Sequence, residues 1–319
     1  MADKILITGS SGFIGMHLSK SLLEDGISIL GVDNMNDYYD PKLKYDRLKQ
    51  LQKFKSFVFV QADISDKEVV DKVFRNFKPD RVVNLAAQAG VRYSLEDPGA
   101  YIQANIVGFM NILEACRHNK VDGLIYASSS SVYGGNKKIP FSIDDSVDKP
   151  ISIYAASKKS NELMAYSYSH LYGLNTTGLR FFTVYGPWGR PDMAMFIFSE
   201  KILNGEPIPV FNHGKMQRDF TFIDDIIEGT KSSIKLNYGC EVFNLGNNKS
   251  EDLMDMIALI EEGLNKKARF NFLDIQPGDV EKSFADIDYS NKMLDFRPKT
   301  SIKDGIPKFL DWYKTYFNI

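Results

Sequence analysis

Residues 4–15 read Lys4-Ile5-Leu6-Ile7-Thr8-Gly9-Ser10-Ser11-Gly12-Phe13-Ile14-Gly15, and this stretch decides the fold. The first residues form an apolar run typical of a buried strand, and a helical stretch over residues 12–24 follows the glycines. A second apolar strand, residues 28–32, ends at Asp33. Strand, glycine-rich turn, helix, strand and terminal acid is the order in which proteins bind a dinucleotide. The pattern therefore predicts a dinucleotide site rather than an ordinary turn.

The turn residues have distinct expected tasks. Gly9 permits the tight turn, Gly12 lets the backbone approach a pyrophosphate, and Gly15 allows the helix to pack closely on the strand. The helix then presents free N–H groups to the phosphates. Asp33 can accept hydrogen bonds from both hydroxyls of the adenosine ribose, and it would repel a 2′-phosphate. We therefore expect NAD rather than NADP.

Strand-like and helix-like segments alternate through the first half of the chain. Strands are expected over residues 4–8, 28–32, 56–61, 81–85, 123–128 and 176–182, and helices over residues 12–24, 41–53, 66–77, 98–118 and 153–171. This alternation predicts an α/β fold, a doubly wound parallel (Rossmann-type) sheet with helices on both faces. Ligands of such sheets bind at the carboxyl ends of the strands.

The pattern changes after about residue 183. Prolines and glycines mark a loop-rich segment, followed by strands over residues 218–223 and 241–245 with a helix between them. Two further helices are expected near residues 252–264 and 302–316. We therefore expect an NAD-binding domain of residues 1–182 plus about 218–247. A smaller interleaved substrate domain takes about 183–217 plus 248–319.

Composition excludes several classes of function. The net charge of −2 over 319 residues gives no basic field for nucleic acid or an anionic membrane. Cys116 and Cys240 are the only cysteines, and no histidine pair has the spacing of metal ligands, so no metal site is expected. No apolar run approaches the roughly 18 residues of a membrane span. We expect a soluble cytoplasmic protein without disulfides.

Tyr154 and Lys158 lie four residues apart, on one face of an expected helix. A tyrosine that acts as a base near pH 7 needs its pKa lowered by about three units, roughly 4 kcal/mol. A nearby lysine and a positively charged nicotinamide ring both favour phenolate. The same spacing occurs by coincidence at Tyr38/Lys42, Tyr45/Lys49 and Tyr133/Lys137. Only Tyr154 starts a helix after a strand that ends in a row of serines, residues 128–131, one of which would hydrogen-bond the reacting hydroxyl.

Segments along nearly the whole chain resemble a known family. They are residues 9–15, 63–64, 84–87, 128–134, 154–158, 180–182 and 218–220. These segments resemble extended short-chain dehydrogenases/reductases that modify nucleotide sugars. Three longer segments, residues 34–40, 90–94 and 183–193, are most similar to those of UDP-glucuronate 4-epimerases.

The resemblance implies a set of site residues. Tyr154 would be the base, Lys158 its cation and Ser129 the group that orients the reacting hydroxyl. Contacts to NAD are implied for Gly9, Gly12, Phe13, Ile14, Gly15, Asp33, Asn34, Asp63, Ile64, Leu85, Ala86, Ala87, Gln88, Asn105, Tyr154, Lys158 and Phe181. Contacts to a UDP-sugar substrate are implied for Arg92, Ser129, Ser130, Ser131, Thr183, Arg190, Phe211, Arg218 and Asp279.

Departures from neighbouring families favour 4-epimerisation of UDP-glucuronate to UDP-galacturonate through a 4-keto intermediate. Sugar-nucleotide dehydratases carry Asp-Glu where this chain has Ser130-Ser131, and UDP-glucuronate decarboxylases carry Glu in place of Ser131. UDP-galactose epimerases carry Asn in place of Thr183 and a bulkier residue than Ser283. A UDP-glucuronate decarboxylase or another UDP-hexose 4-epimerase stays an alternative, as does a non-catalytic NAD-binding regulator. Asp33 disfavours a simple NADPH-dependent carbonyl reductase.

The resemblance also implies a homodimer. Members of the family commonly pair through the helices that correspond to residues 98–118 and 153–171. Apolar side chains on these stretches either form that interface or face the sheet; they are Ile102, Ile106, Phe109, Ile112, Leu163 and Tyr166.

Overall fold

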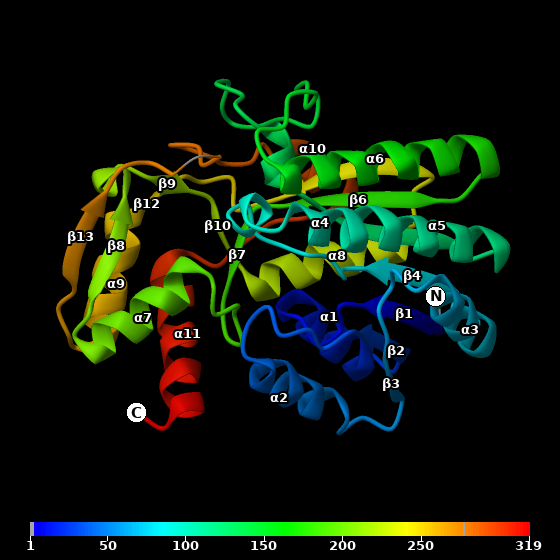
Figure 1. The fold of residues 1–319 in the computed structure, drawn as a ribbon, viewed down its shortest axis with the longest axis horizontal. Coiled ribbons are helices and arrows are strands. Elements are labelled where there is room, and N and C mark those ends of the chain that lie inside the picture. The colour runs from blue at the N-terminus through cyan, green and yellow to red at the C-terminus, as the bar shows by residue number, and fades with distance from the viewer. Residues whose placement is uncertain (1–2, 277) are drawn as a thin grey trace.

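A computed structural model describes residues 3–276 and 278–319, and a seven-stranded parallel sheet lies at its centre (Figure 1). The strand order is β11-β6-β5-β4-β1-β2-β3. The strands are β1 (Lys4–Thr8), β2 (Ser28–Asp33), β3 (Phe57–Gln61), β4 (Arg81–Asn84), β5 (Gly123–Ser129), β6 (Thr176–Phe181) and β11 (Cys240–Leu245). The order reverses between β1 and β4, which places a crevice at their carboxyl ends. The predicted doubly wound sheet is confirmed.

Helices cover both faces of this sheet. One face carries α1 (Phe13–Glu24), α2 (Pro41–Leu51) and α8 (Ile223–Leu236), and the other carries α3 (Lys67–Phe77), α5 (Gly108–His118) and α6 (Ile153–Tyr172). Alternate side chains of a strand point to opposite faces, so Ile5 and Ile7 join one core and Leu6 joins the other. All three are fully buried, which explains why β1 is apolar throughout.

The helix predicted over residues 98–118 is interrupted. It consists of α4 (Pro98–Tyr101), a π-helical segment over Ile102–Val107, and α5. A π-helical turn holds an extra residue and shifts the side chains that follow it. Asn105 lies in this segment and is buried. The periodicity of the sequence did not reveal this interruption, because its apolar residues continue on both sides.

A second group of elements packs beside the sheet (Figure 1). It contains α7 (Ala194–Asn204), α9 (Leu253–Leu264), α11 (Ile302–Phe317) and three strand pairs. The strand pairs are β7 (Thr183–Tyr185) with β10 (Phe220–Phe222), β8 (Pro207–Phe211) with β13 (Arg269–Leu273), and β9 (Gln217–Arg218) with β12 (Glu251–Asp252). The helix α10 (Asp288–Leu294) instead contacts α8 and β11, so this part of residues 248–319 packs on the large sheet.

The prediction of a loop-rich segment after residue 183 was incomplete, because α7 and β8 lie within it. The core of α7 reads Met195-Phe196-Ile197-Phe198, which is apolar all round and has no polar face that would reveal a helical period.

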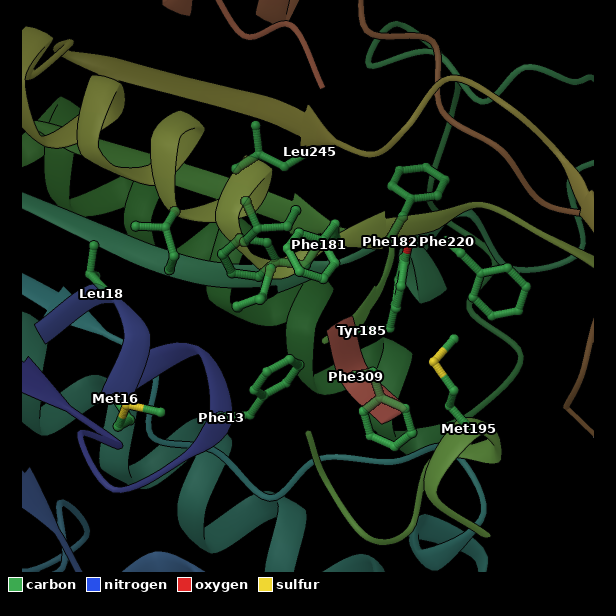
Figure 2. Close-up of a cluster of buried hydrophobic side chains, with 14 of the residues drawn as sticks. Phe13, Met16, Leu18, Phe181, Phe182, Tyr185, Met195, Phe220, Leu245 and Phe309 are labelled. Carbon is green, nitrogen blue, oxygen red and sulfur yellow. The ribbon is translucent and has the colours of Figure 1, made fainter. Parts of the chain in front are cut away.

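One hydrophobic cluster joins the two groups of elements. Figure 2 follows it from α1, with Phe13 and Met16, past Phe181 at the end of β6 to Met195 of α7 and Phe309 of α11. These side chains are at most 8% exposed. The substrate-side elements therefore pack on the sheet as one body rather than through a flexible linker.

Within the described ranges, no helix is both long and apolar enough to cross a bilayer. The same residues contain no group of three or more His, Cys, Asp or Glu placed to hold a metal ion.

Candidate active site

A cavity of about 790 Å³ opens at the carboxyl ends of β1, β2, β4, β5 and β6. Its other wall comes from the ends of β8 and β9, the segment around Arg190 and the segment 278–283. Every residue that the sequence predicts to contact NAD or substrate lines this cavity, except Asn105. The fold thus brings together residues from position 9 to position 279.

Asn105 supports the wall of the cavity from behind. Its side-chain oxygen accepts a hydrogen bond from the Gln88 N–H (2.8 Å), and its amide donates to the Gln88 carbonyl (3.0 Å) and to Ser157 Oγ (2.9 Å). Asn105 therefore fixes the loop after β4 against α6.

The glycine-rich turn leaves room that side chains would fill. A Cβ on Gly9, which has φ +69°, would lie 2.8 Å from the Ala86 nitrogen, and a Cβ on Gly15 would lie 2.0 Å from the Gly9 carbonyl oxygen. The Gly12 N–H donates to that same oxygen (2.9 Å), which closes the turn just before α1. Bare backbone at a helix N-terminus fits a pyrophosphate.

Carboxylates lie at the ends of β2 and β3, beyond this turn. Asp33 is nearly buried and accepts hydrogen bonds from the N–H groups of Ser11 (3.1 Å) and Met35 (2.9 Å). Asp63 accepts from Asn34 Nδ2 (2.9 Å). Burial alone would raise the pKa of Asp63, but hydrogen bonds from Asn34 and Ser65 hold it below its usual value. Two carboxyl groups at this end of the cavity fit ribose hydroxyls and disfavour a 2′-phosphate, so it suits NAD.

Tyr154, Lys158 and Ser129 meet in the middle of the cavity wall. Ser152 caps the N-terminus of α6 by accepting from the Ala155 N–H (3.1 Å), which sets Tyr154 and Lys158 on the first turns of the helix. Lys158 Nζ donates to the Ala127 carbonyl (2.9 Å), and burial lowers the pKa of Lys158 to about 8.

Burial raises the pKa of the Tyr154 phenol, while its hydrogen bond with Ser129 and the positive charge of Arg190 act in the opposite direction. The phenol therefore keeps its proton at neutral pH. A positive charge placed in the cavity would favour the phenolate. Arg190 is a positive charge that the sequence analysis did not connect with Tyr154, beside Lys158 and the nicotinamide ring.

The serine row at the end of β5 is supported by a buried ion pair. Glu162 of α6 accepts from Ser128 Oγ (2.7 Å) and from two nitrogens of Arg180 of β6 (2.8 and 2.9 Å). Ser131 Oγ in turn donates to Ser129 Oγ (2.9 Å). The sequence analysis placed Arg180 in a segment that resembles the family, residues 180–182, but missed Glu162, which is one helical turn after Lys158.

Charged and aromatic groups line the other end of the cavity. Arg218 donates to the carbonyls of Gln217 (2.9 Å) and Glu281 (3.1 Å). The Arg92 guanidinium lies 4.8 Å from the ring centre of Phe211, and its Nη2 is 3.7 Å from Asp279 Oδ2. These four residues come from three distant parts of the chain.

Arg190 is held by two residues that the sequence analysis did not select. Arg190 Nε donates to Asp192 Oδ1 (3.0 Å), Arg190 Nη2 pairs with Asp192 Oδ2, and Tyr38 Oη donates to the same Oδ2 (3.2 Å). Both Tyr38 and Asp192 lie in the segments most similar to UDP-glucuronate 4-epimerases, so the sequence contained this signal.

The chain is similar to proteins of known or named function. The family model described as "NAD dependent epimerase/dehydratase family" matches residues 5–246. The chain is 52% identical to protein CapI of Staphylococcus aureus over 98% of this chain and 99% of the relative. It is 44% identical to UDP-glucuronate 4-epimerase 4 of Arabidopsis thaliana over 98% of this chain and 76% of the relative.

Among solved structures, it resembles the UDP-glucuronic acid 4-epimerase of Bacillus cereus, crystallised with UDP-glucuronic acid and NAD. The TM-score is 0.93 at 35% identity, and the match covers 98% of this chain and 99% of the other.

Proposed function

Because this chain belongs to the NAD dependent epimerase/dehydratase family, we propose that it interconverts UDP-glucuronate and UDP-galacturonate through a 4-keto intermediate. Family membership confirms the resemblance found in the sequence, and with it an enzyme that uses NAD. One observation supports this choice of reaction most directly. Tyr154, Ser129 and Arg190 line the same cavity as the glycine-rich turn of residues 9–15.

In this proposal Tyr154 removes the proton of the sugar's 4-hydroxyl and later returns it. Ser129, which lines the same cavity as Tyr154, orients that hydroxyl. Lys158 lies beneath them and contributes positive charge that stabilises phenolate. NAD, held by the glycine-rich turn and by Asp33 and Asp63, would supply the hydride acceptor and donor for C4. The pre-formed positions of these side chains provide much of the rate acceleration, because the reacting atoms need a short and aligned approach.

The choice of UDP-glucuronate rests on the residues next to this centre. A sugar with a C4 ketone and a C6 carboxylate is a β-keto acid, which loses carbon dioxide when the C5–C6 bond stands perpendicular to the carbonyl plane. Ser130, Ser131 and Thr183 are small neutral donors, and Arg190 adds a charge-assisted one. We assign these four residues to the carboxylate, which they would hold in an unreactive orientation.

We assign the UDP portion to the opposite end of the cavity. Arg218 would neutralise phosphate, Asp279 would accept from the ribose, and Arg92 and Phe211 would meet the phosphate and the uracil. In domain terms, residues 1–182 plus about 218–247 would bind NAD, and about 183–217 plus 248–319 would bind the UDP-sugar. We further propose that the enzyme is a homodimer that pairs through α5 and α6.

The direct test is proton NMR of the sugar after incubation of purified protein with UDP-glucuronate and no added cofactor. We expect UDP-galacturonate to accumulate to a constant ratio, because NAD is regenerated in each turnover. Formation of a UDP-pentose would identify a decarboxylase instead. An unchanged spectrum, even with NAD added, would refute the proposal.

A further inference from the structure

Arg190 is the one cation that we assign to the substrate carboxylate, and its surroundings fix both its backbone and its side chain. The fully buried Arg47 of α2 donates to the carbonyls of Trp188 (2.7 Å) and Gly189 (3.0 Å), and the His17 ring bonds to the carbonyl of Pro187 (2.9 Å). The carbonyl groups of the three residues just before Arg190 are therefore each bonded to a side chain of another segment. The side chain therefore starts from a rigid segment.

The guanidinium is bonded on one edge only. Asp192 accepts from Nε and from one N–H of Nη2. A guanidinium has five N–H groups, so the two on Nη1 and the second on Nη2 are left for a ligand. Within residues 3–276 and 278–319, no other acceptor bonds to Arg190. Arg190 and Asp192 both line the cavity, so a substrate carboxylate meets a cation that is already paired with an anion.

Tyr38 completes the arrangement from the other side of the cavity. Its hydroxyl donates to Asp192 Oδ2. Burial and, second to it, the negative charge of Asp192 raise the pKa of Tyr38 to about 12. Gly90 leaves space for this contact: it has φ +99°, and a Cβ there would lie 3.2 Å from the Tyr38 hydroxyl and 3.8 Å from Arg190 Nη2. Three separate segments thus meet around the Arg190–Asp192 pair.

We propose that Asp192 and Tyr38 are positioning residues for Arg190. Asp192 partly neutralises the charge of Arg190, so that Arg190 binds the substrate carboxylate but releases it when the sugar rotates. This inference rests on the proposed function. A guanidinium without this carboxylate partner would bind the substrate carboxylate more tightly and in one pose. Tight binding of the ground state lowers KM without helping turnover, and here it opposes the rotation that 4-epimerisation requires.

The test separates binding from turnover. Binding is measured by calorimetry on a Tyr154→Phe background, with its bound NAD, so that no reaction occurs during the titration. We expect Asp192→Asn to lower the Kd for UDP-glucuronate about five- to tenfold and to change the Kd for UDP-glucose less than about twofold. In the active background, the same substitution is expected to lower both KM and kcat for UDP-glucuronate, kcat by about tenfold.

Tyr38→Phe keeps Asp192 and removes only the hydroxyl, and it is expected to act in the same direction by about two- to threefold. Asp311→Asn on α11 and Tyr45→Phe on α2 are matched controls, since both residues are exposed and lie outside the cavity. Weaker binding of UDP-glucuronate by Asp192→Asn, or equal changes for both nucleotides, would show that Asp192 only shapes the pocket and would overturn the inference. If the wild-type enzyme does not epimerise UDP-glucuronate, the proposed function fails, while the binding comparison still decides the role of Asp192.

Discussion

Asp219 shows how a single buried residue supports the substrate end of the cavity. Its carboxyl group accepts hydrogen bonds from the N–H groups of Asn247 (2.6 Å) and Ala285 (3.1 Å) and from Thr221 Oγ1 (2.9 Å). It thereby ties the chain next to Arg218 to two distant segments. Burial raises the pKa of Asp219 to about 6, although these hydrogen bonds act in the opposite direction.

This raised pKa predicts a pH dependence of stability. Between about pH 4 and pH 6 the native state keeps a proton on Asp219 that the unfolded chain releases, so this residue's contribution to stability falls as the pH rises through that window and is constant above it. The loss is about 3 kcal/mol. Urea unfolding of the wild type and Asp219→Asn from pH 4 to pH 7 measures it, because the variant lacks this titration. A constant difference in unfolding free energy across that range would contradict the assignment.

Single residues were predictable where their chemistry is local. The glycines at positions 9, 12 and 15, the acid at the end of β2, and Tyr154 with Lys158 all follow from short patterns, and the structure places them at one cavity. Asp192, Glu162 and Asp219 were not predictable in this way. Glu162 and Asp219 bond to partners in other segments, and only the fold sets those distances. Asp192 pairs with Arg190 two residues away, but its bond to Tyr38 also depends on the fold.

At the scale of elements, the Glu162–Arg180 pair joins α6 to β6 and fixes the serine row of β5. Both side chains are about 5% exposed, so removal of one partner leaves an uncompensated buried charge. We predict that Glu162→Ala lowers the unfolding free energy by about 3–5 kcal/mol. Urea unfolding at pH 7 provides the measurement. Glu206→Ala, which removes an exposed ion pair with Lys201, is the control and should leave stability unchanged.

A double variant checks the physical reason. Glu162→Leu combined with Arg180→Met removes both charges and fills similar volume, so it should recover much of the stability that Glu162→Ala loses. If the double variant is no more stable than Glu162→Ala, the loss comes from packing or from Ser128 rather than from the unpaired charge.

Helices and strands were predictable where the hydrophobic pattern of the sequence matches the alternation of strands and helices in a parallel sheet. The strands and helices from β1 to β6 were expected within a few residues of their bounds, because each is buried on a face that its sequence displays. The helices α7 and α10, the strand β13 and the π-helical segment were not. The burial of their apolar residues depends on the rest of the molecule and does not follow a local period. In β13, for example, Phe270 and Phe272 are both exposed.

At the scale of the whole molecule, the side chains predicted for a dimer surface follow both of the alternatives given above: some face the sheet and others are exposed. Phe109 and Ile112 of α5 are buried and face the sheet, whereas Leu163 and Tyr166 of α6 are 57% and 64% exposed. Neighbouring exposed apolar side chains on one helix face are typical of a protein interface. We predict that the wild type sediments as a dimer and that Leu163→Glu sediments as a monomer. Leu236→Glu, at the exposed end of α8, is the control and should stay dimeric. A monomeric wild type would refute the proposed homodimer.

The position of β11 has a consequence for synthesis of the protein. This edge strand, Cys240–Leu245, pairs with β6 and so completes the large sheet only after residues 183–239 have been translated. A nascent chain that ends just before residue 240 exposes the edge of β6 and the apolar residues that β11 covers. Ribosome-bound intermediates of this length are therefore expected to need chaperones, and both halves of the enzyme reach their native state together.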